Sequence, residues 1–368
     1  MADASRADAP LLDAALATDI ATVLRDGRPL IDLRSPTEFA RGAFPNATNL
    51  PLLDDAERAS VGICYKAHGQ AAAIALGERL VSGETRERRI DAWSQLAARH
   101  PDALLYCWRG GLRSETVQRW LAERGRRLPR IAGGYRAMRR VCLETLEVIA
   151  TRDVVVLGGR TGSGKTRELA AIDGAIDLEA LANHRGSAFG SQPTPQPTPI
   201  AFENALAVAL LRIPPTRTIV LEDESRTIGQ LGLPEPVHRK LQSAPLFVLE
   251  IARPARAEHI YDEYVAAPLA HGLDGAALHV RLAAALARIA RRLGGVRAAQ
   301  IAAALADAFA SGARDAHLRW IERLLEWYYD PMYDHQLERK AERIVARGDA
   351  AFVVGAIARH VAERARIA

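Results

Sequence analysis

The feature that most constrains the fold is a glycine-rich pattern at residues 159–166, which matches G-x-x-x-x-G-K-[ST]. The apolar residues 154–157 before it predict a buried strand, and residues 167–171 after it predict a helix. Backbone N–H groups in such a turn can surround a phosphate chain, with Lys165 on its outer oxygens and Thr166 as a Mg²⁺ ligand. The alternative is a chance glycine-rich turn. The candidate phosphate-binding residues are Gly159, Arg160, Thr161, Gly162, Ser163, Gly164, Lys165 and Thr166.

Acidic residues end a second predicted strand, at residues 218–224. Any of Glu222, Asp223 and Glu224 could hold Mg²⁺ through water, and Thr166 with Asp223 is the candidate Mg²⁺ pair. The alternative is an acidic strand cap, so the sequence fixes no metal ligand. His184 and Arg185 lie in a predicted turn before a long Gly-, Ser- and Pro-rich loop. Such a loop inside a compact domain is either functional or disordered. The candidate supporting residues here are Asp223, Glu224, His184 and Arg185.

A second constrained stretch is Y-C-W-R-G-G-L-R-S at residues 106–114. It lies between a predicted buried strand at residues 103–106 and a predicted helix at residues 115–121. Cys107 therefore lies where backbone N–H groups can stabilise a thiolate and a bound anion. This pattern predicts a nucleophilic sulfur that handles an anionic group, and the alternative is a buried, inert cysteine. The candidate catalytic residues are Cys107, Arg109 and Arg113, and Gly110 and Gly111 support them by letting the backbone turn.

The segment D-L-R-S-P-T-E-F-A-R-G-A-F-P-N-A-T-N-L-P, residues 32–51, comes before this loop. Together the segment and the cysteine loop resemble the rhodanese sulfurtransferases, over roughly residues 12–140. The resemblance implies that Cys107 carries a chalcogen as a persulfide and that Asp32 and Arg34 support the site. Cys64 is a candidate second thiol, against a purely structural role.

Composition limits the class of protein. A chain of 368 residues suggests two or three domains. Its three cysteines form no C-x-x-C pair or zinc-like cluster, which fits a reducing cytoplasm. We expect no secretion signal, because the first ten residues lack a basic segment followed by an apolar core. We also expect no membrane segment, because no run of about 18 apolar residues exists.

Positive charge is concentrated in residues 99–140, which contain eleven arginines and only three acidic residues, Asp102, Glu115 and Glu123. The resulting surplus of eight positive charges in this segment exceeds the net charge of +5 for the whole chain. A basic field around Cys107 suits a polyanionic partner such as RNA. The alternative is a solvated, arginine-rich surface.

The order of strands and helices predicts an α/β fold with parallel sheets. We expect a rhodanese-like domain at residues 1–140 and a P-loop NTPase-like domain at residues 141–265. Residues 266–368 should form a helical region packed on the P-loop domain. One of its helices, residues 318–329, is expected to stop at Pro331. A cluster of aromatic residues near that point could stack a base or pack the helical region: Trp327, Tyr328, Tyr329 and Tyr333.

Five motifs occur in a fixed order along the chain: C-W-R-G-G-x-R-S, G-G-x-T-G-S-G-K-T, D-L-E-x-L-A-x-H-R-G-S-x-F-G, E-D-E-S-R-x-I-G and Y-Y-D-P-x-Y. In this order they resemble bacterial tRNA 2-selenouridine synthases over nearly the whole chain. The resemblance implies that 2-thiouridine at the wobble position is S-geranylated with geranyl diphosphate and then selenated with selenophosphate. It also implies a tRNA anticodon stem-loop as substrate, selenophosphate synthetase as a candidate partner and no tightly bound cofactor.

Two other functional classes fit the same motifs. One is a rhodanese sulfurtransferase coupled to a P-loop ATPase or kinase, which nucleotide hydrolysis by the purified protein would favour. The other is a non-catalytic carrier of selenium or persulfide, which multiple turnover on tRNA without a partner would exclude.

Overall fold

The computed structural model describes residues 16, 17 and 19–367, which fall into two units. Unit 1 runs to Leu146 and also includes Thr198–Arg212, whereas unit 2 comprises Glu147–Pro197 and Ile213–Ala368. The chain thus contributes helix α9 (Pro199–Arg212) to unit 1 from the middle of unit 2. This division differs from the predicted boundaries, which placed residues 198–212 in the P-loop domain and made residues 266–368 a separate region.

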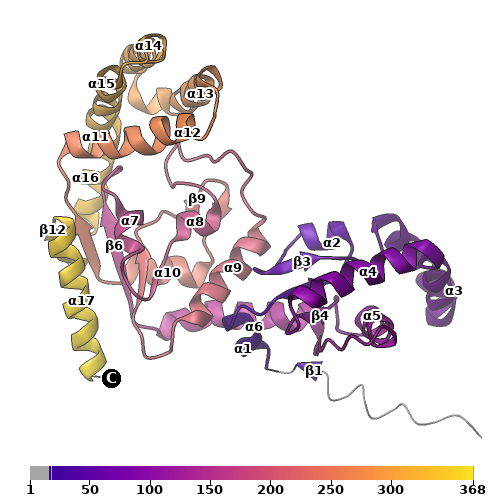
Figure 1. Ribbon diagram of the computed structural model, residues 1–368. Coiled ribbons are helices and arrows are strands. Elements are labelled where there is room, and N and C mark those ends of the chain that lie inside the picture. The colour runs from indigo at the N-terminus through magenta and orange to yellow at the C-terminus, as the bar shows by residue number, and fades with distance from the viewer. Residues whose placement is uncertain (1–15, 18, 368) are drawn as a thin grey trace, which may run out of the picture. The chain divides into compact units, whose positions relative to one another are not determined.

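Unit 1 is built on a parallel sheet with the strand order β1-β5-β4-β2-β3 (Figure 1). Its central strands β2 and β4 are completely buried, as expected for a parallel sheet with both faces covered. Asp32 in β2 is in register with Tyr106 in β4, so the ends of both strands lie at one edge. The described strands are β1 (Leu16–Ala17), β2 (Leu30–Asp32), β3 (Ala47–Asn49), β4 (Leu104–Tyr106) and β5 (Arg130–Ile131).

The helices of unit 1 connect these strands. They are α1 (Ile20–Arg25), α2 (Pro36–Ala40), α3 (Asp55–Leu80), α4 (Gly83–Arg99), α5 (Leu112–Glu123) and α6 (Gly134–Val148), followed by α9. Helix α3 begins at a capping box that Asp54 and Glu57 form. It bends at Gly69, whose φ of 79° interrupts the helical backbone.

Unit 2 contains a second parallel sheet, with the strand order β12-β11-β6-β8-β7. The glycine-rich pattern connects its central strand β6 (Val154–Gly159) to helix α7 (Lys165–Leu169), as the sequence predicts. The other strands are β7 (Ala175–Ile176), β8 (Ile219–Glu222), β11 (Leu246–Leu249) and β12 (Ile344–Gly348). Smaller elements of this unit are η2 (Ile149–Thr151), α8 (Leu178–Ala182), β9 (Thr227–Ile228), β10 (Leu231–Gly232), α10 (Glu235–Ser243) and η5 (Ala341–Arg343).

The C-terminal region requires a correction, because a strand interrupts the helices expected over residues 266–368. Strand β12 pairs in parallel with β11 at the edge of the sheet, and α17 (Ala350–Ile367) then packs on the sheet through Val353 and Ile357. Strand β12 has only five residues, with alternating burial, and so short a strand cannot be distinguished in the sequence from the helical pattern around it. The helices between β11 and β12 are therefore an insertion between two adjacent strands.

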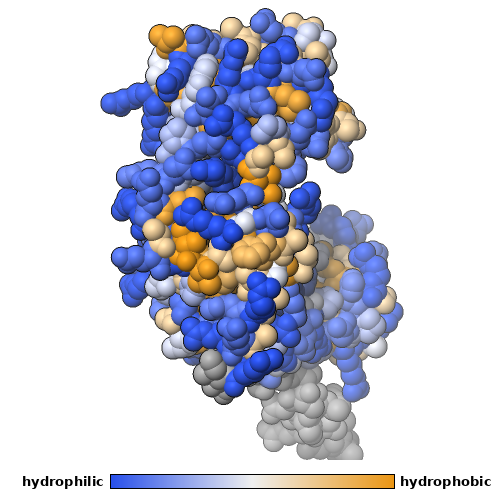
Figure 2. Space-filling model, turned by 90° about the vertical axis from the view of Figure 1, so that its left-hand side faces the viewer, coloured by the Kyte–Doolittle hydropathy of each residue, from blue (hydrophilic) through white to orange (hydrophobic). Residues whose placement is uncertain are grey.

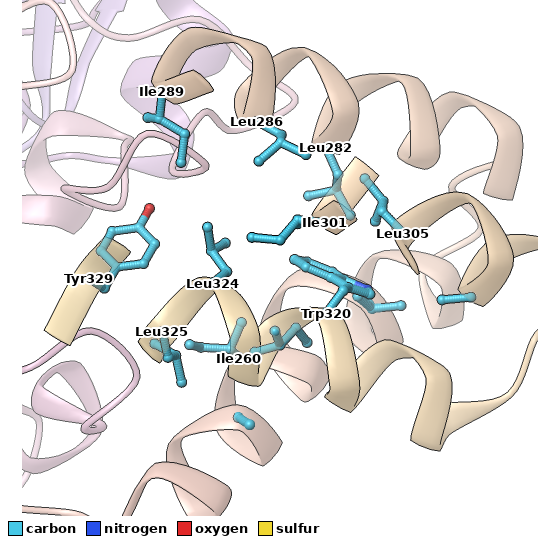
Figure 3. Close-up of a cluster of buried hydrophobic side chains, with 14 of the residues drawn as sticks. Ile260, Leu282, Leu286, Ile289, Ile301, Leu305, Trp320, Leu324, Leu325 and Tyr329 are labelled. Carbon is cyan, nitrogen blue, oxygen red and sulfur yellow. The ribbon is translucent and has the colours of Figure 1, made fainter. Parts of the chain in front are cut away.

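This helical insertion has its own apolar core (Figure 3). It comprises α11 (Arg253–Tyr261), η3 (Asp262–Ala266), α12 (Ala267–Ala270), α13 (Gly275–Leu293), α14 (Gly295–Ser311), α15 (Arg314–Leu324), η4 (Leu325–Tyr329) and α16 (Asp330–Arg339). Pro331 does not stop the helix as expected. The turn before it, η4, is a π-helix, and Pro331 occupies the first turn of α16, where a missing N–H costs least.

The surface in Figure 2 is mostly hydrophilic, with local apolar patches. Two large apolar side chains are exposed on the C-terminal elements, Val345 on β12 and Phe352 on α17. Within the described part of the chain, no helix combines the length and apolar character needed to cross a membrane.

Candidate functional site

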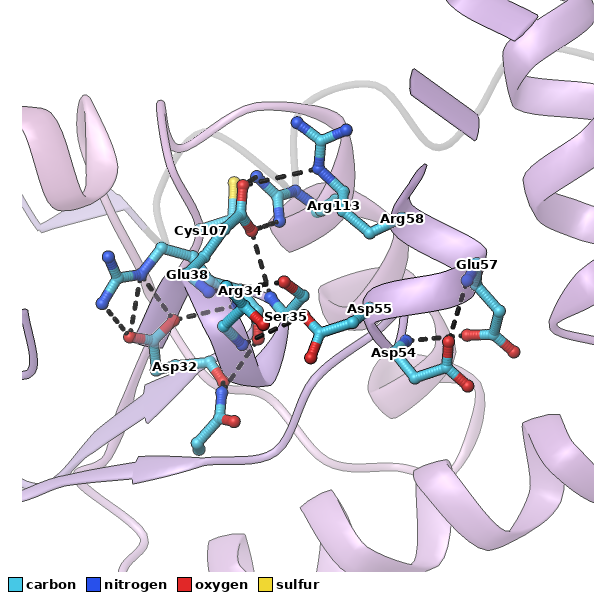
Figure 4. Close-up of polar contacts among 12 residues, drawn as sticks. Asp32, Arg34, Ser35, Glu38, Asp54, Asp55, Glu57, Arg58, Cys107 and Arg113 are labelled. Atoms are coloured by element: carbon cyan, nitrogen blue, oxygen red, sulfur yellow. Dashed lines mark hydrogen bonds and ion pairs between the residues drawn. The ribbon is translucent and has the colours of Figure 1, made fainter. Parts of the chain in front are cut away.

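Cys107 directly follows β4 and begins the loop before α5, as the sequence predicts. Its side chain is only 3% exposed. The sulfur lies 3.4 Å from the hydroxyl oxygen of Ser114 and 3.9 Å from the carbonyl oxygen of Gly111. Figure 4 shows Cys107 together with the ion pair between Arg113 and Glu38. Ser114 in turn donates to the Gly111 carbonyl over 2.9 Å. The thiol is therefore held in a shielded position by the loop and by the first turn of α5.

Glycine is required at Gly110 but not at Gly111. Gly110 has a φ of +68°, and a Cβ there would lie 2.6 Å from the carbonyl oxygen of Ile131. Gly134 faces the same loop, and a Cβ on it would lie 2.3 Å from the carbonyl oxygen of Cys107. No atom lies within 4 Å of the corresponding position on Gly111. The cysteine loop and the start of α6 thus pack backbone against backbone, which fixes the Cys107 main chain.

The two predicted arginines of this loop have different surroundings. Arg113 forms an ion pair of 2.6 Å with Glu38, which also lies 3.4 Å from Arg58. Burial alone would raise the pKa of Glu38, but the hydrogen bond and charge of Arg113 outweigh it and lower that pKa. Arg109 is exposed and has no ion pair among the described residues. Arg109 is therefore the cation available to an anionic ligand, whereas Arg113 organises the loop.

Asp32 and Arg34 form a completely buried ion pair of 2.7 Å below the loop. The Tyr106 hydroxyl also hydrogen bonds to Asp32, and the Arg34 guanidinium lies 3.8 Å from the centre of the Tyr135 ring. Trp108 stacks on Tyr135, with ring centres 5.1 Å apart, and its own ring centre lies 6.0 Å from the Arg34 guanidinium. Asp32 and Arg34 therefore support the site from beneath, whereas Trp108 is 38% exposed and can meet a ligand.

The other two cysteines lie outside this arrangement. Cys142 is buried in α6, where desolvation raises the pKa of its thiol to about 12 and keeps it protonated. Cys64 is half-buried within α3. Neither lies in a glycine-rich loop next to a helix N-terminus.

The phosphate loop of unit 2 is held in shape by side chains from α7 and α11. Lys165 donates to the carbonyl oxygen of Gly159 over 3.1 Å, and the buried Arg256 donates to that of Thr161 over 3.1 Å. The Ser163 hydroxyl is buried and has no partner among the described residues. An unsatisfied buried hydroxyl is unfavourable, and a phosphate oxygen bound in the loop is a suitable partner for it.

Other residues of this loop face outward or toward the helical insertion. Arg160 donates to Asp334 of α16 over 3.0 Å, and Thr166 is exposed at the start of α7. A ring nitrogen of His259 lies 2.9 Å from the carbonyl oxygen of Gly162. The helical insertion therefore contributes directly to the shape of the phosphate loop.

Three glutamates converge behind Lys165. Glu179 in α8, Glu222 at the end of β8 and Glu224 have carboxylate oxygens within 4.8 Å of one another. Burial raises the pKa of Glu222 well above its usual value and that of Glu224 to about 8, and repulsion from Glu179 is the second cause of both shifts. Burial would lower the pKa of Lys165, but Tyr333 and these carboxylates outweigh it and the net shift is upward.

The glutamates fit a divalent cation better than the predicted pair Thr166 and Asp223. One oxygen of Glu222 is buried and has no partner among the described residues, and three convergent carboxylates are typical oxygen ligands for Mg²⁺. Asp223 is instead engaged by Lys340, which donates to both of its carboxylate oxygens. When bound, a divalent cation would neutralise the glutamates and the charge of an adjacent phosphate chain. Glu179 was missed as a candidate, although it lies in the D-L-E motif.

His184 and Arg185 are both near this region, but only Arg185 lines the cavity described below. Arg185 forms an ion pair of 2.8 Å with Glu263 and lies over the Tyr264 ring. His184 pairs with Ser191 in an isolated bridge, and burial, with the charge of Arg288, lowers its pKa. His184 therefore stays neutral and orders the loop.

The phosphate loop opens into a cavity of about 1360 Å³ within unit 2. Its walls carry basic residues from α13, including Arg288 and Arg292, and aromatic residues that include Tyr264, Tyr329 and Tyr333. Sequence patterns indicated the tyrosines of η4 and α16 as base-stacking or packing residues. The sequence patterns did not indicate the α13 arginines or Tyr264 as site residues, because these residues are far from the phosphate loop along the chain.

Comparisons with known proteins agree with the motifs. Residues 152–364 match the family model described as the tRNA 2-selenouridine synthase AAA domain. A tRNA 2-selenouridine synthase from Hahella chejuensis is 49% identical over 91% of this chain and 92% of its own. One from Bordetella bronchiseptica is 50% identical over 87% of this chain and 91% of its own. A protein of that name from Cupriavidus necator is 47% identical over 94% of this chain and 98% of its own. With identity at this level over most of both chains, the protein belongs to the tRNA 2-selenouridine synthase family.

Proposed function

We propose that the protein is a transferase that converts 2-thiouridine at the wobble position of tRNA to 2-selenouridine in two steps. In the first, the nucleoside sulfur attacks the first carbon of geranyl diphosphate, and pyrophosphate leaves with the electron pair of the broken C–O bond. In the second, the selenium of selenophosphate attacks the ring carbon that carries the geranylthio group, and geranylthiolate leaves with the electron pair of the broken C–S bond; water then cleaves the P–Se bond and releases phosphate. The observation that carries the proposal is that one chain of this family holds both a shielded thiol beside a cationic loop and a lysine-bearing phosphate loop.

The phosphate loop supports the first step. Negative charge develops on the diphosphate as the C–O bond breaks, and a preformed set of N–H groups and a cation stabilise that charge. Lys165 and the unpartnered Ser163 hydroxyl both belong to this loop. In this step the nucleophile is the sulfur of the tRNA itself, so no protein thiolate is needed.

The Cys107 loop supports the second step. Arg109 offers a cation to selenophosphate without breaking an ion pair among the described residues. Burial of the Cys107 sulfur keeps bulk water away from the selenium donor held beside it. The exposed Trp108 ring offers a stacking surface for the modified base.

Arginines on unit 1 support tRNA as the substrate. Of the eleven arginines at residues 99–140, five form ion pairs, with Glu38, Glu87, Glu115, Glu203 and Glu144. The remaining six have no ion pair among the described residues: Arg99, Arg109, Arg119, Arg126, Arg127 and Arg136. Unpaired arginines are free to contact the phosphates of an anticodon stem-loop. We also propose selenophosphate synthetase, the class of enzyme that supplies the selenium donor, as a partner and the cytoplasm as the compartment.

The test is a nucleoside analysis of 2-thiouridine tRNA after incubation with the protein, geranyl diphosphate and selenophosphate. We expect S-geranyl-2-thiouridine with the first donor alone and 2-selenouridine with both, without any nucleotide. Lys165→Ala should reduce geranylation by roughly a hundred-fold or more, as for loss of one transition-state donor. Lys240→Ala, which removes a lysine of α10 that is not among the residues lining this cavity, is the matched control and should remain active. A requirement for ATP, with its hydrolysis, would instead favour a sulfurtransferase coupled to a P-loop ATPase or kinase.

A further inference from the structure

A small apolar pocket lies behind the phosphate cavity, between α11, α13 and α15 of the helical insertion. Beyond its mouth, it is lined by apolar side chains that include Leu282, Trp320, Ile321 and Leu324. Figure 3 shows several of these side chains arranged around a common space. Among the described residues that line the pocket, none is charged. The Trp320 indole N–H already donates to His317 over 3.2 Å. The pocket therefore offers no free polar partner beyond its mouth.

The mouth of this pocket is shared with the phosphate cavity. Residues that line both spaces include Thr161 of the phosphate loop, Ser187, Tyr264 and Tyr329. The two tyrosines come from the π-helical turns η3 and η4, and such turns are frequent at functional sites. The apolar pocket and the phosphate loop are thus adjoining parts of one binding region.

The Tyr329 hydroxyl is buried and has no partner among the described residues. Figure 3 shows it directed away from the neighbouring Leu325 side chain. A buried phenol without a partner is unfavourable in the free protein. A ligand oxygen at the mouth, between the phosphates and the apolar pocket, would satisfy it.

We propose that the apolar pocket binds the hydrocarbon chain of an alkyl diphosphate whose phosphates lie in the loop at residues 159–166. This inference rests on the proposed function and assigns the residues that recognise the alkyl group. A nucleotide fits poorly, because its sugar and base would lose hydrogen bonds to water without replacement in this pocket. A hydrocarbon chain loses none and gains from leaving water.

The pocket is almost closed in the free protein. Its volume is about 20 Å³, which is enough for about one water-sized group. A chain of ten carbons therefore enters only when side chains such as Leu282 and Leu324 rotate away from the mouth. We expect alkyl diphosphate binding to reorganise η3 and η4, while pyrophosphate alone leaves them unchanged.

The test compares ligands that differ only in the length of the alkyl chain. Binding of pyrophosphate and of the thiolodiphosphate analogues of dimethylallyl, geranyl and farnesyl diphosphate is measured by calorimetry. In the unmodified protein, geranyl should bind at least roughly ten-fold more tightly than dimethylallyl, because its five additional carbons become buried. Leu282→Phe, which fills the pocket, should remove most of this preference without changing pyrophosphate affinity. Leu282→Ala should instead favour farnesyl over geranyl.

The matched control is Leu278→Ala, because Leu278 is an equally buried leucine one turn earlier on α13 that does not line the pocket. Unfolding curves and pyrophosphate affinity report whether each variant is folded. Equal binding of pyrophosphate and geranyl by the unmodified protein would contradict the alkyl donor of the proposed function itself. A clear preference for geranyl that the Leu282 variants leave unchanged would overturn only the pocket assignment.

Discussion

Lys340 donates to both carboxylate oxygens of Asp223, at 2.7 and 2.6 Å. The two residues are 117 positions apart in the sequence. Asp223 directly follows strand β8, and Lys340 follows α16 at the end of the helical insertion. This ion pair connects the edge of the sheet that carries the phosphate loop to the last helix before β12.

Breaking this pair should destabilise unit 2. Both side chains are mostly buried, so Lys340→Met leaves the Asp223 charge without a partner and should lower the free energy of unfolding by about 2 kcal/mol. Asp223→Asn in the same background should restore part of the loss, because it removes the uncompensated charge. Denaturant unfolding of the two single variants and the double variant measures the coupling. Strictly additive losses would show that the pair contributes no interaction energy.

Cys107→Ser should separate the two proposed steps. The variant should still convert 2-thiouridine to its S-geranyl form, which then accumulates, and should yield no 2-selenouridine. Cys64→Ser and Cys142→Ala should leave both products near normal, because neither residue lies in an anion-binding loop. Mass spectrometry of tRNA nucleosides gives the 2-thiouridine substrate and both products in one measurement. Substantial 2-selenouridine from Cys107→Ser would mean that selenophosphate acts on the nucleoside without the thiol.

Asp330 should make stability depend on pH in acid. It accepts two hydrogen bonds of 2.8 Å from the buried Arg256, and although burial alone would raise the pKa of Asp330, these bonds lower it below 3.8. The unfolded chain therefore takes up a proton at higher pH than the folded chain. The stabilisation is complete above about pH 4 and is lost as the pH falls through the folded-state pKa.

Asp330→Asn should consequently be less stable than the unmodified protein by roughly 3 kcal/mol at neutral pH. The difference should shrink below about pH 4, where the unmodified carboxylate becomes protonated. Asp334 pairs with Arg160 and is more exposed than Asp330, so Asp334→Asn should lower the free energy of unfolding by at most about 1 kcal/mol. Thermal unfolding between pH 3 and 7 distinguishes the two variants. A constant difference across this range would exclude the ion pair as its cause.

Binding of tRNA should depend strongly on salt if the unpaired arginines of unit 1 contact phosphates. Replacing Arg119, Arg126 and Arg127 by Gln should flatten the plot of log affinity against log salt, by up to roughly two to three units of slope. As a control, the same replacement at Arg217, Arg226 and Arg239 removes three arginines that form ion pairs in unit 2. Filter binding at several salt concentrations gives both slopes. Equal slopes for the two triple variants would place the RNA contacts elsewhere.

Local sequence was sufficient to locate both reactive loops. A short apolar run followed by glycines and a helical pattern specifies a strand–loop–helix turn whatever surrounds it, and both Cys107 and Lys165 lie in such turns. The parallel sheets followed from the alternation of strands and helices. The motifs also identified the family, since several of them are long and occur in a fixed order.

Only the tertiary structure decided which residues complete these sites. Glu179 meets Glu222 across 43 residues, Lys340 reaches Asp223 across 117, and β12 joins the sheet after the whole helical insertion. These contacts arise from chain reversals over long separations, and periodicity within a segment carries no information about them. The same holds for the apolar pocket, whose walls come from three helices of the insertion. The sequence by itself therefore determined the two loops that hold Cys107 and Lys165, and folding determined the charges and the cavity around them.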